Sequence, residues 1–219
     1  MINKLIYLSK QICSFCVGME GNVSAKNDKK IYIKASGSKL KKLRKNDIVE
    51  YDIEGNQVSN FNKKGSMELT FHLFLLKFKD INFVAHTHPI NTVSILCSKK
   101  AEIFSKNRIF PDQVIFNDAE SCLVPYAKPG LELTQKIIES VNKYIQKNDK
   151  FPKLILLKNH GIIACGRTEN ECIVISEICE KAAEIFIKTN NISEISFLKS
   201  EEIDNLLSDE KEKYRHSLL

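Results

Sequence analysis

Apolar residues recur with a helical spacing in six stretches of the chain. The spacing predicts helices over residues 2–17, 66–79, 89–99, 130–147, 168–189 and 199–214. Local signals support three of these helices, because Ser66 and Thr168 are suitable N-cap residues and Pro89 is tolerated in a first turn. The last stretch is strongly charged, so we expect its helix to lie mostly in solvent.

Strand signals lie between these helices. "KIYIKAS" (residues 30–36) alternates apolar and polar residues, and "DIVEYDIEGNQV" (47–58) indicates a strand followed by a turn. "NFVAHTH" (82–88) is a third strand, and "KLILLKNHGIIACG" (153–166) contains two apolar strands around a tight turn. Several neighbouring strands are joined by very short turns. This favours a mixed or antiparallel sheet covered by helices over a purely parallel sheet.

Length and composition indicate one folded domain spanning residues 1–219. The chain has 219 residues, 43% of them hydrophobic, which is enough for a full core without disulfide support. We find no internal repeat and no apolar run of membrane-spanning length. The start lacks a signal-peptide cleavage site and is better interpreted as an amphipathic helix. The seven cysteines are odd in number and mostly lie in apolar segments, which fits reduced thiols in a cytoplasmic protein.

Two local features could suggest other functions. Cys13 and Cys16 form a C-x-x-C, but no second pair completes a zinc ribbon, so two thiols on a helix are favoured. The net charge is +6, and the densest basic run is Lys39–Lys45. It is not joined to stacking aromatic residues or a docking helix, so we expect a solvated surface and no nucleic-acid partner.

The candidate chemistry is carried by histidines. His86 and His88 are two residues apart on a strand, so their side chains project to the same side and could bind one metal ion. His160 occupies the tip of the turn between the two apolar strands, beside Gly161. Three histidines with one open coordination position are typical of a catalytic zinc site. Whether the three converge depends on the fold, and each could equally be a polar residue at a strand end or turn.

Four motifs together resemble the class II aldolase/adducin family, most closely its fuculose-1-phosphate aldolase type. They are "GMEGNVSAK" (18–26), "GSMELTFH" (65–72), "VAHTHP" (84–89) and "LLKNHGIIACG" (156–166), in the family's order over roughly residues 1–190. The resemblance implies a three-layer α/β/α fold with a central, mainly antiparallel sheet. It also implies Zn²⁺ or a similar divalent metal on His86, His88 and His160, and a homotetramer with active sites at subunit boundaries.

The resemblance also assigns a catalytic role to Glu68. This residue matches the family's acidic residue, which can ligate the resting metal and then act as acid and base. Retro-aldol cleavage leaves negative charge on the carbonyl fragment, which a metal stabilises as an enediolate while a carboxylate moves the proton. Without the resemblance, Glu68 would be interpreted as an ordinary first-turn acid. His72 lies one turn further along the same helix face, where packing or hydrogen bonding is its expected role.

Phosphate binding is implied for a set of small polar residues: Asn22, Ser36, Gly37 and Ser66. Backbone N–H groups and hydroxyls can hold an anion. Two departures weaken the set, since Met67 replaces a hydroxyl and Glu20 adds a negative charge. Residues 89–124 also lack the tyrosine that fuculose-type aldolases use as a proton donor, and Tyr214 is only a weak match for a second one.

The resemblance therefore implies a zinc-dependent aldolase acting on a small sugar phosphate. Other reactions on the same scaffold stay open: dehydration of methylthioribulose phosphate, epimerisation of a pentulose phosphate, or decarboxylation. Glutamate at position 68 counts against the epimerases, which carry aspartate there. A non-enzymatic, adducin-like module is disfavoured because the chain retains all three histidines.

Overall fold

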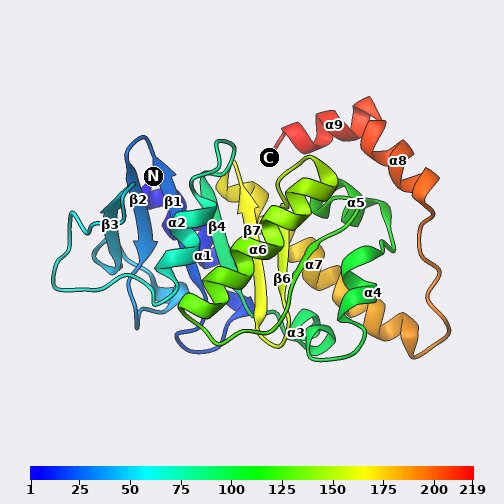
Figure 1. The fold of residues 1–219 in the computed structure, drawn as a ribbon, viewed down its shortest axis with the longest axis horizontal. Coiled ribbons are helices and arrows are strands. Elements are labelled where there is room, and N and C mark those ends of the chain that lie inside the picture. Colours follow the sequence, from blue (N-terminus) through cyan, green and yellow to red (C-terminus); the bar gives the residue numbers. More distant parts are fainter.

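A seven-stranded sheet forms the centre of the protein. The computed structural model describes all of residues 1–219 (Figure 1). The strands are β1 (Asn22–Asn27), β2 (Lys30–Lys34), β3 (Ile48–Asp52), β4 (Phe83–Thr87), β5 (Cys122–Val124), β6 (Leu154–Leu157) and β7 (Gly161–Gly166). Their order across the sheet is β3-β2-β1-β4-β7-β6-β5.

Every neighbouring pair of strands is antiparallel except β5 and β6, which run parallel. Short turns join β1 to β2 and β6 to β7, and the β6–β7 hairpin is the one that the sequence predicts. Strands β4 and β7 pair in the middle of the sheet although about 75 residues separate them, with His86 opposite Ile163. The predicted mainly antiparallel sheet is confirmed, and its central pair carries the histidines.

Helices cover both faces of the sheet, which gives the expected three layers. The helices are α1 (Ile2–Ile12), α2 (Leu69–Leu75), α3 (Ile90–Leu96), α4 (Ala101–Lys106), α5 (Pro111–Asn117), α6 (Leu131–Asn148), α7 (Glu169–Asn190), α8 (Ser200–Ser208) and α9 (Glu210–Ser217). Figure 1 shows α2 and α6 crossing the front of the sheet, with α1 and α7 behind it.

Two apolar clusters, one on each face, hold these layers together. Leu5, Leu8 and Ile12 of α1 pack with one set of strand residues and with α7. Phe71 of α2 packs with Ile137 of α6 and the opposite set of strand residues. Successive strand residues point to opposite faces, so one strand contributes to both clusters. Burial against the sheet, and not helix propensity alone, therefore fixes where these helices lie.

Several predicted boundaries are wrong in detail. Helix α2 begins at Leu69 instead of Ser66, and the single C-terminal helix is two helices, α8 and α9, with a break at Asp209. Strand β1 was not predicted, because Asn22 and Ser24 are buried polar residues on a strand and conceal its alternation. The short elements α4, α5 and β5 were also missed. Thr168 does cap α7, accepting a hydrogen bond from the Glu171 backbone N–H.

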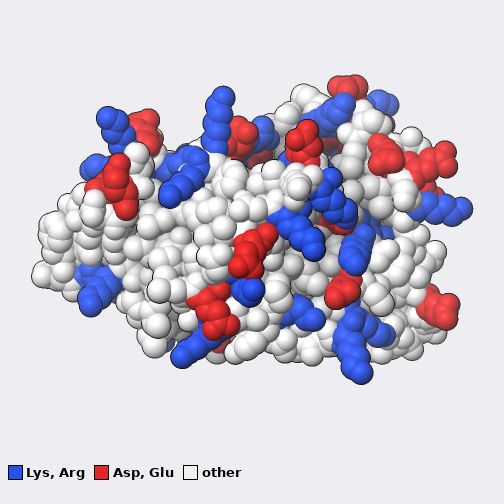
Figure 2. Space-filling model, in the orientation of Figure 1, with Lys and Arg blue, Asp and Glu red and all other residues white.

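Charged side chains are interspersed on the face seen in Figure 2, where lysine and arginine alternate with acidic residues. This agrees with the interpretation of the basic residues as solvated surface. No helix combines the length and apolar character needed to cross a membrane.

Candidate metal centre and active site

The first two histidines come from the end of a fully buried strand. His86 lies in β4, and its Nδ1 is 2.8 Å from the carbonyl oxygen of Ile162 on β7. That hydrogen bond places the proton on Nδ1 and leaves Nε2 free as an acceptor. His88 follows β4 directly, and its Nε2 lies 3.0 Å from Nε2 of His86. The H-x-H spacing therefore brings the two rings together as predicted.

The third histidine is brought to them by a tight turn. His160 lies in the connection between β6 and β7, where Asn159 adopts a positive φ of 57°, a conformation that asparagine tolerates better than most residues. At Gly161 a Cβ atom would lie 2.4 Å from the Thr87 carbonyl oxygen and 2.6 Å from the His88 ring. Only glycine allows this close approach of the turn to the end of β4.

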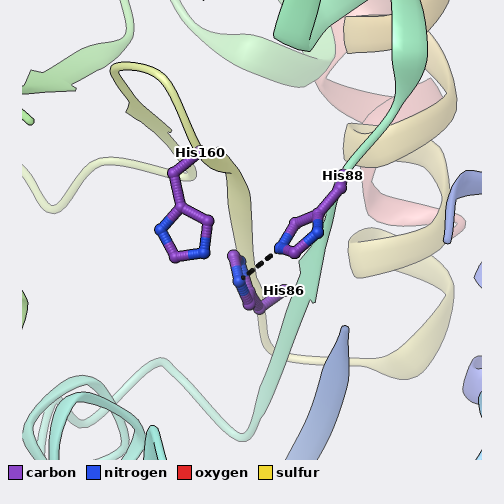
Figure 3. A group of neighbouring side chains, drawn as sticks. All are labelled: His86, His88 and His160. Atoms are coloured by element: carbon purple, nitrogen blue, oxygen red, sulfur yellow. Dashed lines mark hydrogen bonds between the residues drawn. The ribbon is translucent and has the colours of Figure 1, made fainter. Parts of the chain in front are cut away.

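The three imidazoles form one cluster, which we call the histidine triad (His86, His88 and His160; Figure 3). Their ring centroids are 4.7, 4.9 and 5.0 Å apart, and one nitrogen of each ring lies within 4.8 Å of the others. Burial is the main cause that lowers the pKa of each ring to about 4. Neutral imidazoles with converging Nε2 atoms are suitable ligands for a divalent metal, and the triad leaves a position open for substrate.

Glu68 extends over the triad from the N-terminal end of α2. Its Oε2 lies 3.3 Å from His86 Nε2, and its Oε1 lies 3.7 Å from His160 Nε2. Glu68 is the N-cap residue of α2 and not a first-turn residue, and its carbonyl oxygen accepts the hydrogen bond of the His72 N–H at 3.5 Å. The carboxylate is thus placed beside the position where the triad would hold a metal.

A buried chain of hydrogen bonds supports Glu68 from behind. The Asn22 side-chain amide donates to Glu68 Oε2 at 2.7 Å. His72 Nε2 contacts Asn22 Oδ1, and His72 Nδ1 lies 2.6 Å from the Ser24 hydroxyl. His72 has no exposed surface, and burial holds its pKa well below the usual range. The hydrogen-bonding role expected for His72 is therefore present, but it is directed at Asn22.

The other predicted phosphate-binding residues gather at one side of the site. A short antiparallel bridge joins Ala35 to Gly65, and it brings the turn containing Ser36 and Gly37 beside Ser66. The Ser36 and Ser66 N–H groups already donate to Lys64 and Lys34 carbonyl oxygens, at 2.9 and 3.0 Å. Their hydroxyls are therefore the donors that remain for an anion. Asn22 is partly used as well, since its amide is held between His72 and Glu68.

A buried cation beside these residues was missed from the sequence. Lys34 is 3% exposed, and its Nζ donates to the carbonyl oxygens of Ser38 at 2.7 Å and Met19 at 3.3 Å. Burial lowers the pKa of its ammonium, and the nearby Cys16 and Glu68 groups offset only part of this effect. Buried charges are normally neutralised by a partner. In the alternating strand "KIYIK" this lysine resembles a solvent-facing residue, and only the covering loops bury it.

The two departures from the family pattern have different surroundings. Glu20 Oε2 lies 3.5 Å from Nδ1 of His88, on the side of the ring that faces away from His86, and it accepts a hydrogen bond from the Val17 N–H. Met67 is 82% exposed beside Ser66. Tyr126 and Tyr214 are also largely exposed. Glu20 therefore contacts the histidine triad and not the Ser36–Gly37 turn.

Comparison with known proteins agrees with this geometry. The family model for the Class II Aldolase and Adducin N-terminal domain matches residues 7–187. An L-fuculose phosphate aldolase of Methanococcus maripaludis (strain C5) is 33% identical over 183 residues, covering 82% of this chain and 91% of that protein. A 5-deoxy-D-ribulose 1-phosphate aldolase of Bacillus thuringiensis is 26% identical, covering 86% and 84% of the two chains.

Solved structures show the same fold. An L-fuculose 1-phosphate aldolase superposes with a TM-score of 0.79 at 22% sequence identity, covering 98% of this chain and 95% of that chain. The chain belongs to the class II aldolase and adducin family. Proteins of this family of lyases generally use a divalent metal, and the histidine triad is where this chain would hold one.

Proposed function

We propose that this protein is a metal-dependent class II aldolase that cleaves a small sugar phosphate by retro-aldol chemistry. The observation that carries this proposal is the histidine triad with the Glu68 carboxylate directly over it. We further propose that the protein acts in the cytoplasm as a homotetramer, as the resemblance to the fuculose-phosphate type implies.

The roles of the residues follow from the charges that cleavage creates. A divalent metal such as Zn²⁺, held by the triad, would supply a Lewis acid for the carbonyl and the neighbouring hydroxyl of the substrate. Breaking the carbon–carbon bond leaves an enediolate on the carbonyl fragment, and this fragment must then accept a proton. The hydroxyl that becomes the aldehyde carbonyl loses a proton as the bond breaks, so one proton is removed and one is added. Glu68 lies beside the triad, its Oε2 accepts a hydrogen bond from the Asn22 amide at 2.7 Å, and it would carry the proton to the enediolate.

The residues at one side of the site favour a substrate that carries an anionic group. The hydroxyls of Ser36 and Ser66 are neutral donors, and Lys34 supplies a buried positive charge whose hydrogen bonds go to backbone carbonyl oxygens. A phosphate near this lysine would offset part of the cost of burying its ammonium. The relatives from Methanococcus maripaludis and Bacillus thuringiensis are both aldolases named for sugar phosphates, which agrees with this assignment.

A product screen tests the reaction. The zinc-loaded protein should be incubated with fuculose 1-phosphate, 5-deoxyribulose 1-phosphate and methylthioribulose 1-phosphate, and the products separated. We expect dihydroxyacetone phosphate and an aldehyde from at least one substrate. The Glu68→Gln variant is the matched control for contaminating aldolases. A dehydrated or epimerised product with all carbons retained would assign one of the other reactions of this scaffold, and the aldolase proposal would be wrong.

A further inference from the structure

The hydrogen-bond chain behind Glu68 allows only one arrangement of its protons. An ionised carboxylate accepts but cannot donate, so the Asn22 amide must direct its NH₂ group toward Glu68. The Asn22 oxygen then faces His72 Nε2, which must carry the ring proton. The neutral ring is bare at Nδ1, where it accepts the hydrogen bond of the Ser24 hydroxyl at 2.6 Å. The direction of each hydrogen bond in this series therefore determines the direction of the next one.

The surroundings of the ring keep this arrangement fixed. His72 and Ser24 have no exposed surface, and Asn22 is 4% exposed, so water cannot replace any of the three partners. The His72 ring also stacks on Phe71 with the ring centroids 4.5 Å apart. If the Asn22 amide rotated by half a turn, its oxygen would face the Glu68 carboxylate and its NH₂ would face a protonated nitrogen. Both contacts would be repulsive inside a buried site.

We propose that His72 is a positioning residue for catalysis. It fixes the orientation of the Asn22 amide, and through this amide it holds the Glu68 carboxylate over the histidine triad. This inference rests on the proposed function, because it acts through the proton-transferring role of Glu68. His72 and Ser24 then serve catalysis through Asn22 and Glu68, without contacting the substrate themselves.

Replacement of His72 by two different amides separates positioning from packing. In His72→Asn the shorter amide can still meet Ser24 but cannot reach Asn22. In His72→Gln the longer amide extends to the position of Nε2 and can donate to the Asn22 oxygen. We expect kcat to fall roughly 10- to 100-fold in His72→Asn, with little change in KM. His72→Gln should recover most of this loss.

A control on the same helix accounts for general damage to α2. Thr70 shares a hydrogen bond of 2.7 Å with Thr134 of α6, away from the triad. Thr70→Val should lower the melting temperature but leave kcat unchanged. Equal kcat losses in His72→Asn and His72→Gln would indicate a purely structural role and overturn the inference, as would a wild-type kcat in His72→Asn. If His72→Asn does not fold, Ser24→Ala replaces it, with a smaller kcat loss expected and an unchanged kcat contradicting the inference.

Nuclear magnetic resonance gives a test that does not depend on turnover. In the ¹⁵N-labelled, zinc-loaded wild type, His72 should be neutral with its proton on Nε2. The Asn22 side-chain amide signals should shift in both Glu68→Gln and His72→Asn but not in Thr70→Val. A proton on Nδ1, or Asn22 signals unaffected by His72→Asn, would overturn the inference. If the wild type cleaves no sugar phosphate, the proposed function fails, while these spectra still decide whether His72 orients Asn22.

Discussion

Replacing Glu68 by glutamine tests the proton-transfer step most directly. The variant keeps nearly the same volume, and its amide oxygen can still accept the Asn22 hydrogen bond that Glu68 Oε2 accepts at 2.7 Å. It removes the only carboxylate that contacts both His86 and His160, at 3.3 and 3.7 Å. A carboxamide is neither an acid nor a base near neutral pH. The change therefore removes the base and preserves the shape of the site.

The size of the effect follows from this geometry. General acid–base catalysis by a positioned side chain contributes roughly 10²- to 10⁴-fold, so we expect kcat to fall by at least about 10²-fold. That loss corresponds to about 2.7 kcal/mol of transition-state stabilisation. Because the triad nitrogens belong to other strands and turns, metal content should be unchanged. The melting temperature should also stay close to that of the wild type.

The assay couples release of dihydroxyacetone phosphate to a reporter enzyme and measures zinc in the same samples. Two variants bracket the result. Glu54→Gln changes an exposed carboxylate in a distant turn and should behave as the wild type. Glu68→Asp keeps the charge but withdraws it by one methylene, so it should give an intermediate rate. A Glu68→Gln enzyme with full metal content and a near-wild-type rate would refute the assignment, and another residue would then have to move the proton.

Four further predictions concern the metal, the anion and the fold. Purified protein should hold about one zinc-like ion per chain, and alanine at all three triad positions should abolish binding, whereas full occupancy in that variant would disprove the site. Met67→Ser should improve the use of phosphorylated substrate, and Ser66→Ala should raise KM several-fold, since one neutral hydrogen bond contributes on the order of 1 kcal/mol. If neither variant has an effect, the substrate is unphosphorylated. Lys34→Met should weaken inhibition by inorganic phosphate, measured against Lys79→Met as an exposed control outside the site. Equal inhibition constants would contradict a role for the buried charge. Glu180 accepts hydrogen bonds from the backbone and side chains at the start of α3, so Glu180→Gln should lower the free energy of unfolding by roughly 1–3 kcal/mol in urea titrations, and an unchanged value would exclude this capping role.

The elements that the sequence predicts best are those with one apolar face. Helices α6 and α7 have long periodic patterns, and β6 and β7 are apolar runs around a turn, so each could be recognised from local residues alone. Strand β1 escaped because polar residues occupy its buried positions next to the site. Asn22 and Ser24 face the same side as His86 and His72, where hydrogen bonding replaces apolar packing. The polar residues needed at the candidate site thus interrupt the apolar pattern by which strand β1 would be recognised.

In the candidate site, too, some residues have a local sequence signal, whereas the role of others depends on partners far away in the sequence. Each histidine of the triad has a local signal, either an H-x-H on a strand or a histidine before glycine in a tight turn. These signals left open whether the three meet; the family resemblance implied it, and the structure brings them together. Lys34 has no such signal, since the strand pattern places it toward solvent until residues 19 and 38 cover it. The role of His72 depends on partners 48 and 50 residues earlier in the chain. The packing of α2 on the sheet brings His72 to β1, and the register of β1 and β4 places Asn22 opposite His86.

The position of these residues in the sheet suggests how catalysis and specificity are separated. His86 and His88 come from β4 and the residue after it, and His160 precedes β7; these two paired strands lie inside the sheet, where they are buried and their register is fixed. The residues assigned to the anion lie in turns after β2 and before α2, toward the β3 edge of the sheet. Turns tolerate sequence change far better than buried central strands. We therefore expect substitutions at positions such as Met67 to change what the site binds without disturbing the triad, and substrate preference should be sought in residues 16–20, 35–38 and 64–67.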